Sequence, residues 1–316
     1  MYRIGIDIGG TNMRVGIFDD GGNLVVKEKI LTNAQEGATV AIKRLKLLIN
    51  EVLNSKEVDK TQKIKGIGVG SPGPLDPWKG EIQSPPNLPG WDNIPLRQNL
   101  QDKYNLPVFL HNDANAAALG EFLYAYNKEV KNLVYITVST GIGGGIISDG
   151  KLMLGDKGSA GEVGHIIIRP DGNMCSCGNR GCLEAQASGT GIFTRTQEAL
   201  KNYDRPTILK NFDLLSSKEI IEAANLGDSF AKHIIEEVQM DLALGIVNIA
   251  HAYNPQKIVF GGGVMQSGDT FIQPVIERAR EMILPSMAEN LDFSVTKLGG
   301  DLGLFGAAAL VDYFQD

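Results

Sequence analysis

The chain has 316 residues, of which 43% are hydrophobic and 21% charged, a balance typical of a soluble globular protein with one large or two smaller domains. Its 37 acidic and 30 basic residues give a formal net charge of −7, which argues against a surface that binds nucleic acid. No apolar run is long enough to span a bilayer and the first residues lack a secretion signal, so we expect a cytoplasmic protein without a membrane partner.

The first part of the chain is predicted to be rich in strands. Ile4, Ile6 and Ile8 alternate with small or polar residues, which is typical of a strand, and the turn "GGTN" follows. The next patterns predict two strands, a helix and a further strand with a glycine-rich exit, over 13–18, 24–30, 37–54 and 64–73. The proline-rich residues 71–95 are expected to form a long irregular loop, which usually serves function.

A similar arrangement recurs about 130 residues later. The stretch "NLVYITVSTGIGGGIISDGKLM", residues 132–153, again predicts a strand, a glycine-rich turn, a strand, an Asp-Gly turn and a strand. This internal repeat predicts two α/β lobes that face a shared cleft, although β-hairpins also resemble one another by chance. Further helices are predicted after Asn112 or Asp113 and over 229–254 and 303–314, with a strand over 257–261.

Three glycine-rich turns follow predicted strands, at 7–12, 139–145 and 261–263. Backbone N–H groups in such turns converge on anions, and Thr11 or Thr140 offers an additional hydroxyl donor. None is a Walker A loop or a G-x-G-x-x-G fingerprint, and one such turn alone is more often a tight turn than a phosphate site. Asp7 precedes the first turn, where a carboxylate either holds Mg²⁺ or caps the turn.

Asp113 lies where the predicted strand "LPVFLHN" meets an alanine-rich helix. A helix cap explains an aspartate at this position. The alternative is a general base that accepts a proton from an attacking hydroxyl group, because the positive end of the helix dipole favours the ionised carboxylate.

All three cysteines and one histidine lie within residues 165–182. His165, Cys175, Cys177 and Cys182 have the spacing H-x9-C-x-C-x4-C, which predicts a closed Cys₃His site for structural zinc rather than three unrelated buried cysteines. Glu162 and Glu184 flank this set. A metal-bound imidazole donates through its other nitrogen, and a donor between two carboxylates suits the vicinal hydroxyls of a sugar.

Six stretches together resemble the ROK family of sugar kinases, most of all its bacterial glucokinases: "DIGGTNMRVGIFD", "HNDANAAALGE", "STGIGGGII", "GEVGHI", "CSCGNRGCLEA" and "VFGGGV". They occur in the family's order and cover nearly the whole chain. The resemblance implies an α/β, actin/hexokinase-like fold with two ribonuclease-H-like lobes around a central cleft. We expect a smaller lobe of 1–111 plus 301–316 and a larger lobe of 112–300 that carries the zinc site.

The resemblance also implies the roles of individual residues. Asp113 matches the catalytic base. The residues matched to sugar binding are Gly73, Asn87, Asn112, Asp113, Glu162, His165 and Glu184. Those matched to ATP and Mg²⁺ are Asp7, Gly9, Gly10, Thr11, Asn12, Thr140, Gly141, Gly143, Gly262 and Gly263. His165 and the three cysteines match the zinc ligands.

The implied activity is ATP-dependent phosphorylation of glucose at its 6-hydroxyl, an early step of carbohydrate metabolism, by a homodimer or homotetramer. N-acetylmannosamine kinases of this family often have Arg after the glycine of the "SPG" stretch, whereas Pro74 stands here, which favours glucose. An N-acetylmannosamine or fructose kinase stays an alternative, as does polyphosphate as donor. ROK regulators add a helix-turn-helix before the first phosphate strand, which begins here at about residue 3, so we expect an enzyme.

Overall fold

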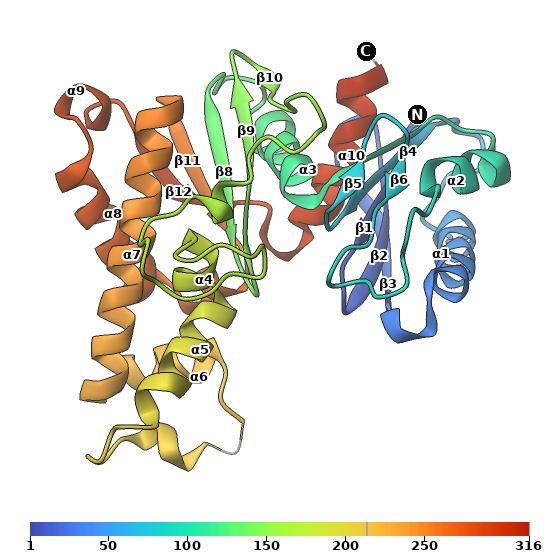
Figure 1. Cartoon of the computed structure of the whole chain (residues 1–316). Helices are drawn as coiled ribbons and strands as arrows, with labels where there is room; N and C mark the ends of the chain where they lie inside the picture. Colours follow the sequence, from blue (N-terminus) through green and yellow to red (C-terminus); the bar gives the residue numbers. More distant parts are fainter. Residues whose placement is uncertain (213, 316) are drawn as a thin grey trace. The chain divides into compact units, whose positions relative to one another are not determined.

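The computed structural model describes residues 1–212 and 214–315, which form two compact α/β units (Figure 1). Unit 1 comprises Met1–Lys131, Gly145–Ala160 and Lys297–Asp316, and unit 2 comprises Asn132–Gly144 and Gly161–Thr296. The predicted lobes differ from these units mainly because residues 112–131 and 145–160 group with unit 1, and the predicted division stays a prediction.

A five-stranded sheet forms the centre of unit 1. Its order is β3 (Leu24–Leu31), β2 (Asn12–Phe18), β1 (Tyr2–Ile8), β4 (Ile64–Ser71) and β7 (Val108–Asn112). The first three strands are antiparallel, whereas β4 runs parallel to β1 and β7 parallel to β4. The helices of this unit are α1 (Ala38–Leu53), α2 (Leu96–Tyr104), α3 (Asp113–Gly120), the π-helix η2 (Glu121–Ala125), α10 (Leu302–Gln315) and the single 3₁₀ turns η1 (Ala34–Glu36) and η6 (Gly299–Asp301).

The alternation of isoleucine and glycine in the first strands has a packing reason. Ile4, Ile6 and Ile8 are buried in one core with the apolar side of α1. On the opposite face the backbone of α10 lies so close to β4 that a side chain at Gly68 would begin 1.7 Å from the carbonyl oxygen of Ala307. Only glycine permits this approach between helix and sheet.

The sheet of unit 2 has the order β10 (Lys151–Leu152), β9 (Ile142–Ser148), β8 (Leu133–Val138), β11 (Lys257–Gly261) and β12 (Asp292–Val295). The residues of β10 and the second half of β9 are grouped with unit 1. The strands β8, β11 and β12 are parallel. The two sheets have the same order: β10, β9, β8, β11 and β12 take the places of β3, β2, β1, β4 and β7. The predicted internal repeat is therefore confirmed as a repeat of topology.

Helices and short 3₁₀ turns complete unit 2. They are η3 (Val163–His165), α4 (Leu183–Ala187), α5 (Gly189–Leu200), η4 (Ile208–Asn211), α6 (Ser217–Asn225), α7 (Ser229–Tyr253), η5 (Gly263–Ser267), α8 (Asp269–Met282) and α9 (Pro285–Ala288). The long helix α7, orange in Figure 1, packs against α6 and α8 and is buried along most of its length, as its apolar pattern predicts.

One sequence expectation about secondary structure needs correction. Residues 71–95 are not wholly irregular, because β5 (Leu75–Asp76) and β6 (Glu81–Ile82) form a short antiparallel ribbon and Trp91 is completely buried beneath it. Among the described residues, no helix combines the length and apolar character needed to cross a bilayer.

Candidate functional site

Several predicted site residues of unit 1 meet at one edge of its sheet. The parallel strands β1, β4 and β7 end there, and the carboxyl ends of parallel strands are the usual place for ligands in α/β folds. A side chain at Gly10 would begin 2.9 Å from the carbonyl oxygen of Asn87, and one at Gly73 would begin 3.6 Å from Nδ2 of Asn112. The structure therefore places Gly10 beside Asn87 and Gly73 beside Asn112.

Asn112, rather than Asp113, caps helix α3. Its Oδ1 accepts hydrogen bonds from the backbone N–H of Ala114 at 2.9 Å and of Asn115 at 3.4 Å. Asp113 is the first residue of the helix, and its Oδ1 accepts from Ala114 N–H at 2.8 Å. Capping alone therefore no longer accounts for the aspartate, because its neighbour already performs that role.

Asp7 forms an ion pair that the sequence reasoning missed. Its Oδ2 accepts hydrogen bonds from Nε and NH2 of Arg14, at 2.8 and 2.5 Å. Arg14 NH1 also donates to the carbonyl oxygen of Gly300, and Gly303 of α10 lies directly against the carboxylate. Arg14 follows Asp7 by seven residues on the adjacent antiparallel strand, so β-strand register was the signal that could have revealed the pair.

The first glycine-rich turn, residues 9–12, is held by several hydrogen bonds. Gly9 N–H donates to the carbonyl oxygen of Asn12 at 2.8 Å. Thr32, which directly follows β3, supports the turn, since its hydroxyl donates to Gly9 O at 2.6 Å and its N–H donates to Thr11 O at 2.8 Å. The turn therefore has a fixed shape before any ligand binds.

The other two glycine-rich turns lie side by side in unit 2, at the ends of the neighbouring strands β8 and β11. Gly262 has a φ of 93°, and a side chain there would begin 2.3 Å from the carbonyl oxygen of Val138. Gly189 at the start of α5 donates its N–H to Ser139 O at 2.7 Å, and Thr190 donates to Thr140 O at 3.2 Å. Two predicted phosphate turns and a helix N-terminus thus share one place.

Next to these turns is a pocket of about 440 Å³, within the size range of small-molecule sites. It is lined by Ser139, Thr140, Gly189, Thr190, Phe193, Leu215, Ser216, Ser217, Gly263 and Val264. A second pocket of about 420 Å³ shares Ser217, Gly263 and Val264 with it and extends over α6. Sequence reasoning predicted the turns but missed the contributions of α5 and α6, because no local motif marks them.

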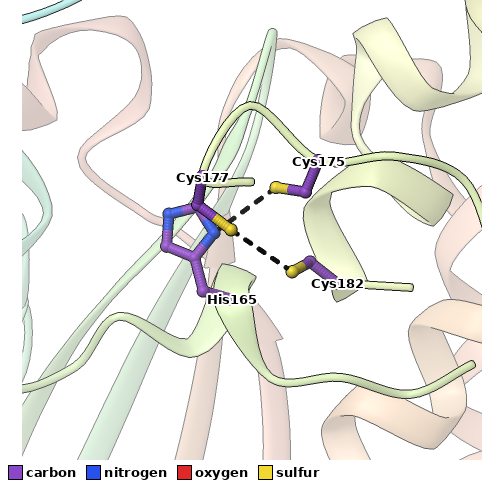
Figure 2. A group of neighbouring side chains, drawn as sticks. All are labelled: His165, Cys175, Cys177 and Cys182. Atoms are coloured by element: carbon purple, nitrogen blue, oxygen red, sulfur yellow. Dashed lines mark hydrogen bonds between the residues drawn. The ribbon is translucent and has the colours of Figure 1, made fainter. Parts of the chain in front are cut away.

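His165, Cys175, Cys177 and Cys182 point toward one another (Figure 2), and their ligand atoms all lie within 4.8 Å of one another. The Sγ atom of Cys175 is 3.6 Å from His165 Nδ1, and the Sγ atoms of Cys177 and Cys182 are also 3.6 Å apart. A tetrahedral zinc ion with bonds of about 2.0–2.3 Å places its ligand atoms about 3.5–3.8 Å apart. The donor set therefore fits zinc in its chemistry, and the two separations of 3.6 Å match the ligand spacing of a zinc site.

The four ligands come from the loop of residues 165–182 between two short helices, which we call the metal loop. His165 ends η3 and Cys182 directly precedes α4, with Cys175 and Cys177 between them. The backbone N–H of Asn179 lowers the pKa of the Cys177 thiol to about 7, whereas burial raises the pKa of Cys182 to about 12. Metal ligation requires thiolates, so binding of a cation at this loop releases protons.

The two carboxylates that flank the cysteine cluster have different surroundings. Because Nδ1 of His165 faces the thiols, its Nε2 faces away from them and lies 4.0 Å from Oε2 of Glu162. Glu184 Oε2 accepts the backbone N–H of Ile142 at 2.9 Å, and a side chain at Gly141 would begin 2.4 Å from that oxygen. Glu184 thus links the metal loop to the phosphate turn, a contact that the sequence did not indicate.

Comparison with known proteins shows which family shares these features. The ROK family model matches residues 3–313. A glucokinase of Halalkalibacterium halodurans is 36% identical over 314 residues, which cover 98% of this chain and 94% of the relative. A xylose repressor of Caldicellulosiruptor bescii is 35% identical over 312 residues, which cover 98% of this chain and 77% of the repressor.

Solved structures agree with this grouping. The ROK hexokinase from Thermus thermophilus has a TM-score of 0.85 at 32% identity, over 100% of this chain and 99% of that one. A ROK family glucokinase from Streptomyces griseus, in complex with glucose and AMPPNP, has a TM-score of 0.81 at 30% identity, over 98% and 99% of the two chains. The predicted actin/hexokinase-like α/β fold is therefore confirmed.

Proposed function

The chain belongs to the ROK family, and from this premise we propose that it is a glucokinase that transfers the γ-phosphoryl group of ATP to the 6-hydroxyl of glucose. The observation that carries the proposal is the pair Asn112 and Asp113. The asparagine caps α3 and the aspartate begins the helix, at the edge of the sheet where the first glycine-rich turn, residues 9–12, also lies. The glucose and AMPPNP in the Streptomyces griseus relative support the choice of substrates.

In the proposed reaction Asp113 accepts the proton of the 6-hydroxyl as its oxygen attacks the γ-phosphorus. A bond forms between that oxygen and phosphorus, and the bond from phosphorus to the leaving ADP oxygen breaks. Phosphoryl transfer depends mainly on positioning and on neutralising charge, to which a general base adds about 10²–10⁴-fold. When Mg²⁺ is bound, it offsets the negative charge of the phosphate oxygens.

The nucleotide side is assigned to the glycine-rich turns. We assign the adenosine to the pocket between α5, α6 and Gly263, where Phe193 offers an aromatic face and Ser217 a hydroxyl group. Backbone N–H groups of the turns at 9–12 and 139–143 are proposed to bind the phosphates, with Thr11, Asn12, Thr140 and Gly143 among them. Asp7 is proposed to serve Mg²⁺, with Arg14 holding the carboxylate in place.

The sugar side is assigned to the residues that the resemblance to the family matches to sugar binding. We propose that the sugar is contacted by Gly73, Asn87, Asn112, Glu162, His165 and Glu184. His165 and the three cysteines would hold structural zinc, which fixes the loop in one conformation. Because Nδ1 of His165 lies on the metal side, its Nε2 is left to donate to a sugar hydroxyl.

The test is a panel of hexoses, each with ATP and Mg²⁺, in which ADP release is followed by a coupled assay. Glucose is expected to give the highest kcat/KM among glucose, fructose, mannose and N-acetylmannosamine. A higher value with N-acetylmannosamine or fructose would refute the substrate assignment. Replacing ATP by polyphosphate and following glucose 6-phosphate instead of ADP tests the donor, and size-exclusion chromatography with light scattering tests the expected homodimer or homotetramer.

A sugar-responsive regulator is the second candidate, because the identity with the xylose repressor is nearly as high as that with the glucokinase. The presence of Asp113 beside its capping neighbour and of all three glycine-rich turns favours the enzyme. Sugar binding without ADP release in the presence of any of the hexoses would favour the regulator instead.

A further inference from the structure

The metal loop is closed at its base by hydrogen bonds between its two ends. Leu183 N–H donates to Ile166 O at 2.9 Å, and Ile168 N–H donates to Gly181 O at 2.9 Å. The two ends approach so closely that a side chain at Gly181 would begin 1.5 Å from the carbonyl oxygen of Arg169. The loop is therefore a closed unit whose position depends on what its base is attached to.

The base is attached to a buried carboxylate in the middle of α7. Asp241 is 0% exposed and forms ion pairs with two arginines. Its Oδ1 accepts Nε of Arg169, from the metal loop, and its Oδ2 accepts NH2 of Arg195, from α5, at 2.5 Å. A buried carboxylate is costly unless it is paired, so Asp241 favours conformations in which both guanidinium groups stay bound to it; Arg195 is largely buried and Arg169 is 46% exposed.

The pairing reaches both flanks of the metal cluster. Arg169 follows the first metal ligand, His165, by four residues and binds Asp241 directly. Gln186 of α4 follows the last ligand, Cys182, by four residues, and its Oε1 accepts a hydrogen bond of 3.0 Å from NH2 of Arg195. Asp241 thus holds the start of the metal loop directly, through Arg169. It holds the end of the loop through Arg195, which binds Gln186.

We propose that Asp241 is a positioning residue for sugar binding, which acts by clamping the base of the metal loop to α7. It lies outside the set of ligand atoms and reaches the loop through Arg169 and Arg195. The sugar part rests on the proposed function, since the clamp fixes the loop that carries His165 and the helix that carries Glu184. The glycine-rich turns of the nucleotide pocket are held by contacts that do not involve Asp241, which are the hydrogen bond from Gly189 N–H to Ser139 O and the close approach of Gly262 to Val138 O.

The central experiment compares Asp241→Asn with Glu237→Gln in the full-length, metal-loaded protein. Glu237 is a matched control, because it lies on the same helix and its Oε2 is 3.6 Å from NH1 of the same Arg195, but its side chain is 47% exposed. Zinc release to an excess of a colorimetric chelator is measured alongside the KM values for glucose and ATP.

Asp241→Asn is expected to accelerate zinc release and to raise the KM for glucose, each by about tenfold, the lower end of the effect of residues that support metal ligands. Its KM for ATP should stay at the wild-type value, as should all three quantities in Glu237→Gln. A purely structural role would lower the melting temperature without separating the two KM values. Wild-type zinc release, or faster release with an unchanged glucose KM, would overturn the proposal.

A second pair of variants keeps the test decisive if Asp241→Asn does not fold. Arg169→Lys retains a cation opposite Asp241, whereas Arg169→Gln removes it. Arg169→Gln should reproduce the faster zinc release and the higher glucose KM, and Arg169→Lys should restore most of both; equal behaviour of the two variants would contradict the clamp. If the wild type phosphorylates no hexose, the proposed function fails. The clamp is still tested in that case, because zinc release is measured without any sugar or nucleotide reaction.

Discussion

Asp113→Asn separates chemistry from stability, because the structure predicts a small effect on folding and a large one on turnover. The substitution keeps the size of the side chain. It also keeps an oxygen that can accept the hydrogen bond from Ala114 N–H, which is 2.8 Å long in the wild type. The cap itself is provided by Asn112 and is unchanged. What the fold loses is the attraction between a carboxylate and the helix N-terminus, about 0.3–1 kcal/mol.

The loss expected in activity is several times larger. Removal of a general base costs about 10²–10⁴-fold in rate. At about 1.36 kcal/mol per factor of ten, this is about 2.7–5.4 kcal/mol of transition-state stabilisation. The variant should therefore melt close to the wild type and still lose at least two orders of magnitude in kcat/KM for glucose, about the lower limit of that range.

The assay measures coupled ADP release at saturating ATP and Mg²⁺, with thermal unfolding measured on the same samples. Asp228→Asn is the matched control. Asp228 caps α7 by accepting the N–H of Ala231 at 2.9 Å, so the control also removes a carboxylate at a helix N-terminus. The control should keep full activity. A folded Asp113→Asn protein that loses less than about tenfold in kcat/KM would refute the role of Asp113 as base.

Three further predictions test other parts of the site. Gly141→Ala would place a methyl group 2.4 Å from Glu184 Oε2, so it should break the bond to Ile142 N–H and lower kcat/KM in the coupled assay by the worth of a hydrogen bond to a charged group, about 1.5–3 kcal/mol; Gly300→Ala, where the added atom meets nothing within 4 Å and the backbone is not left-handed, is the control. Cys177→Ser should release zinc and weaken glucose binding but not nucleotide binding, as measured by metal analysis and calorimetry; intact glucose binding in the metal-free variant would contradict it. Burial lowers the pKa of His111 to about 3 from 6.5, so the unfolded chain takes up a proton before the native one does as the pH falls. Native stability should therefore drop by about 1.4 kcal/mol per pH unit below 6.5, and denaturant titrations of His111→Gln should show a shallower dependence.

The groupings of residues that the sequence already indicates are those encoded within a short stretch of chain. The four metal ligands lie within eighteen residues, and their spacing alone indicates a shared cation. The glycine-rich turns follow predicted strands directly, so their place at the sheet edge follows from strand direction. Helix 37–54 was predicted within one residue of each observed end, because its apolar spacing persists over four turns.

The parts that the sequence did not reveal depend on contacts between distant segments. Asp241 follows Arg169 by 72 residues, and a polar residue in the apolar stripe of α7 gives no sign of its partner. Phe193 and Ser217 reach the pocket because α5 and α6 pack beside the turn at 139–142. The edge strand β12 was also missed, since four residues with two half-buried side chains carry little periodicity.

Glu184 explains why loss of the metal should affect the sugar before the nucleotide. Its carboxylate meets the phosphate turn through Ile142 N–H, but it lies only two residues after the last metal ligand, Cys182, so its position depends on the loop. The turn has supports of its own, from Ser139 N–H to Gly141 O at 2.8 Å and from Gly189 N–H to Ser139 O at 2.7 Å. A loosened metal loop therefore removes the anchor of Glu184 and His165 together, whereas the phosphate turn keeps the hydrogen bonds that give it its shape.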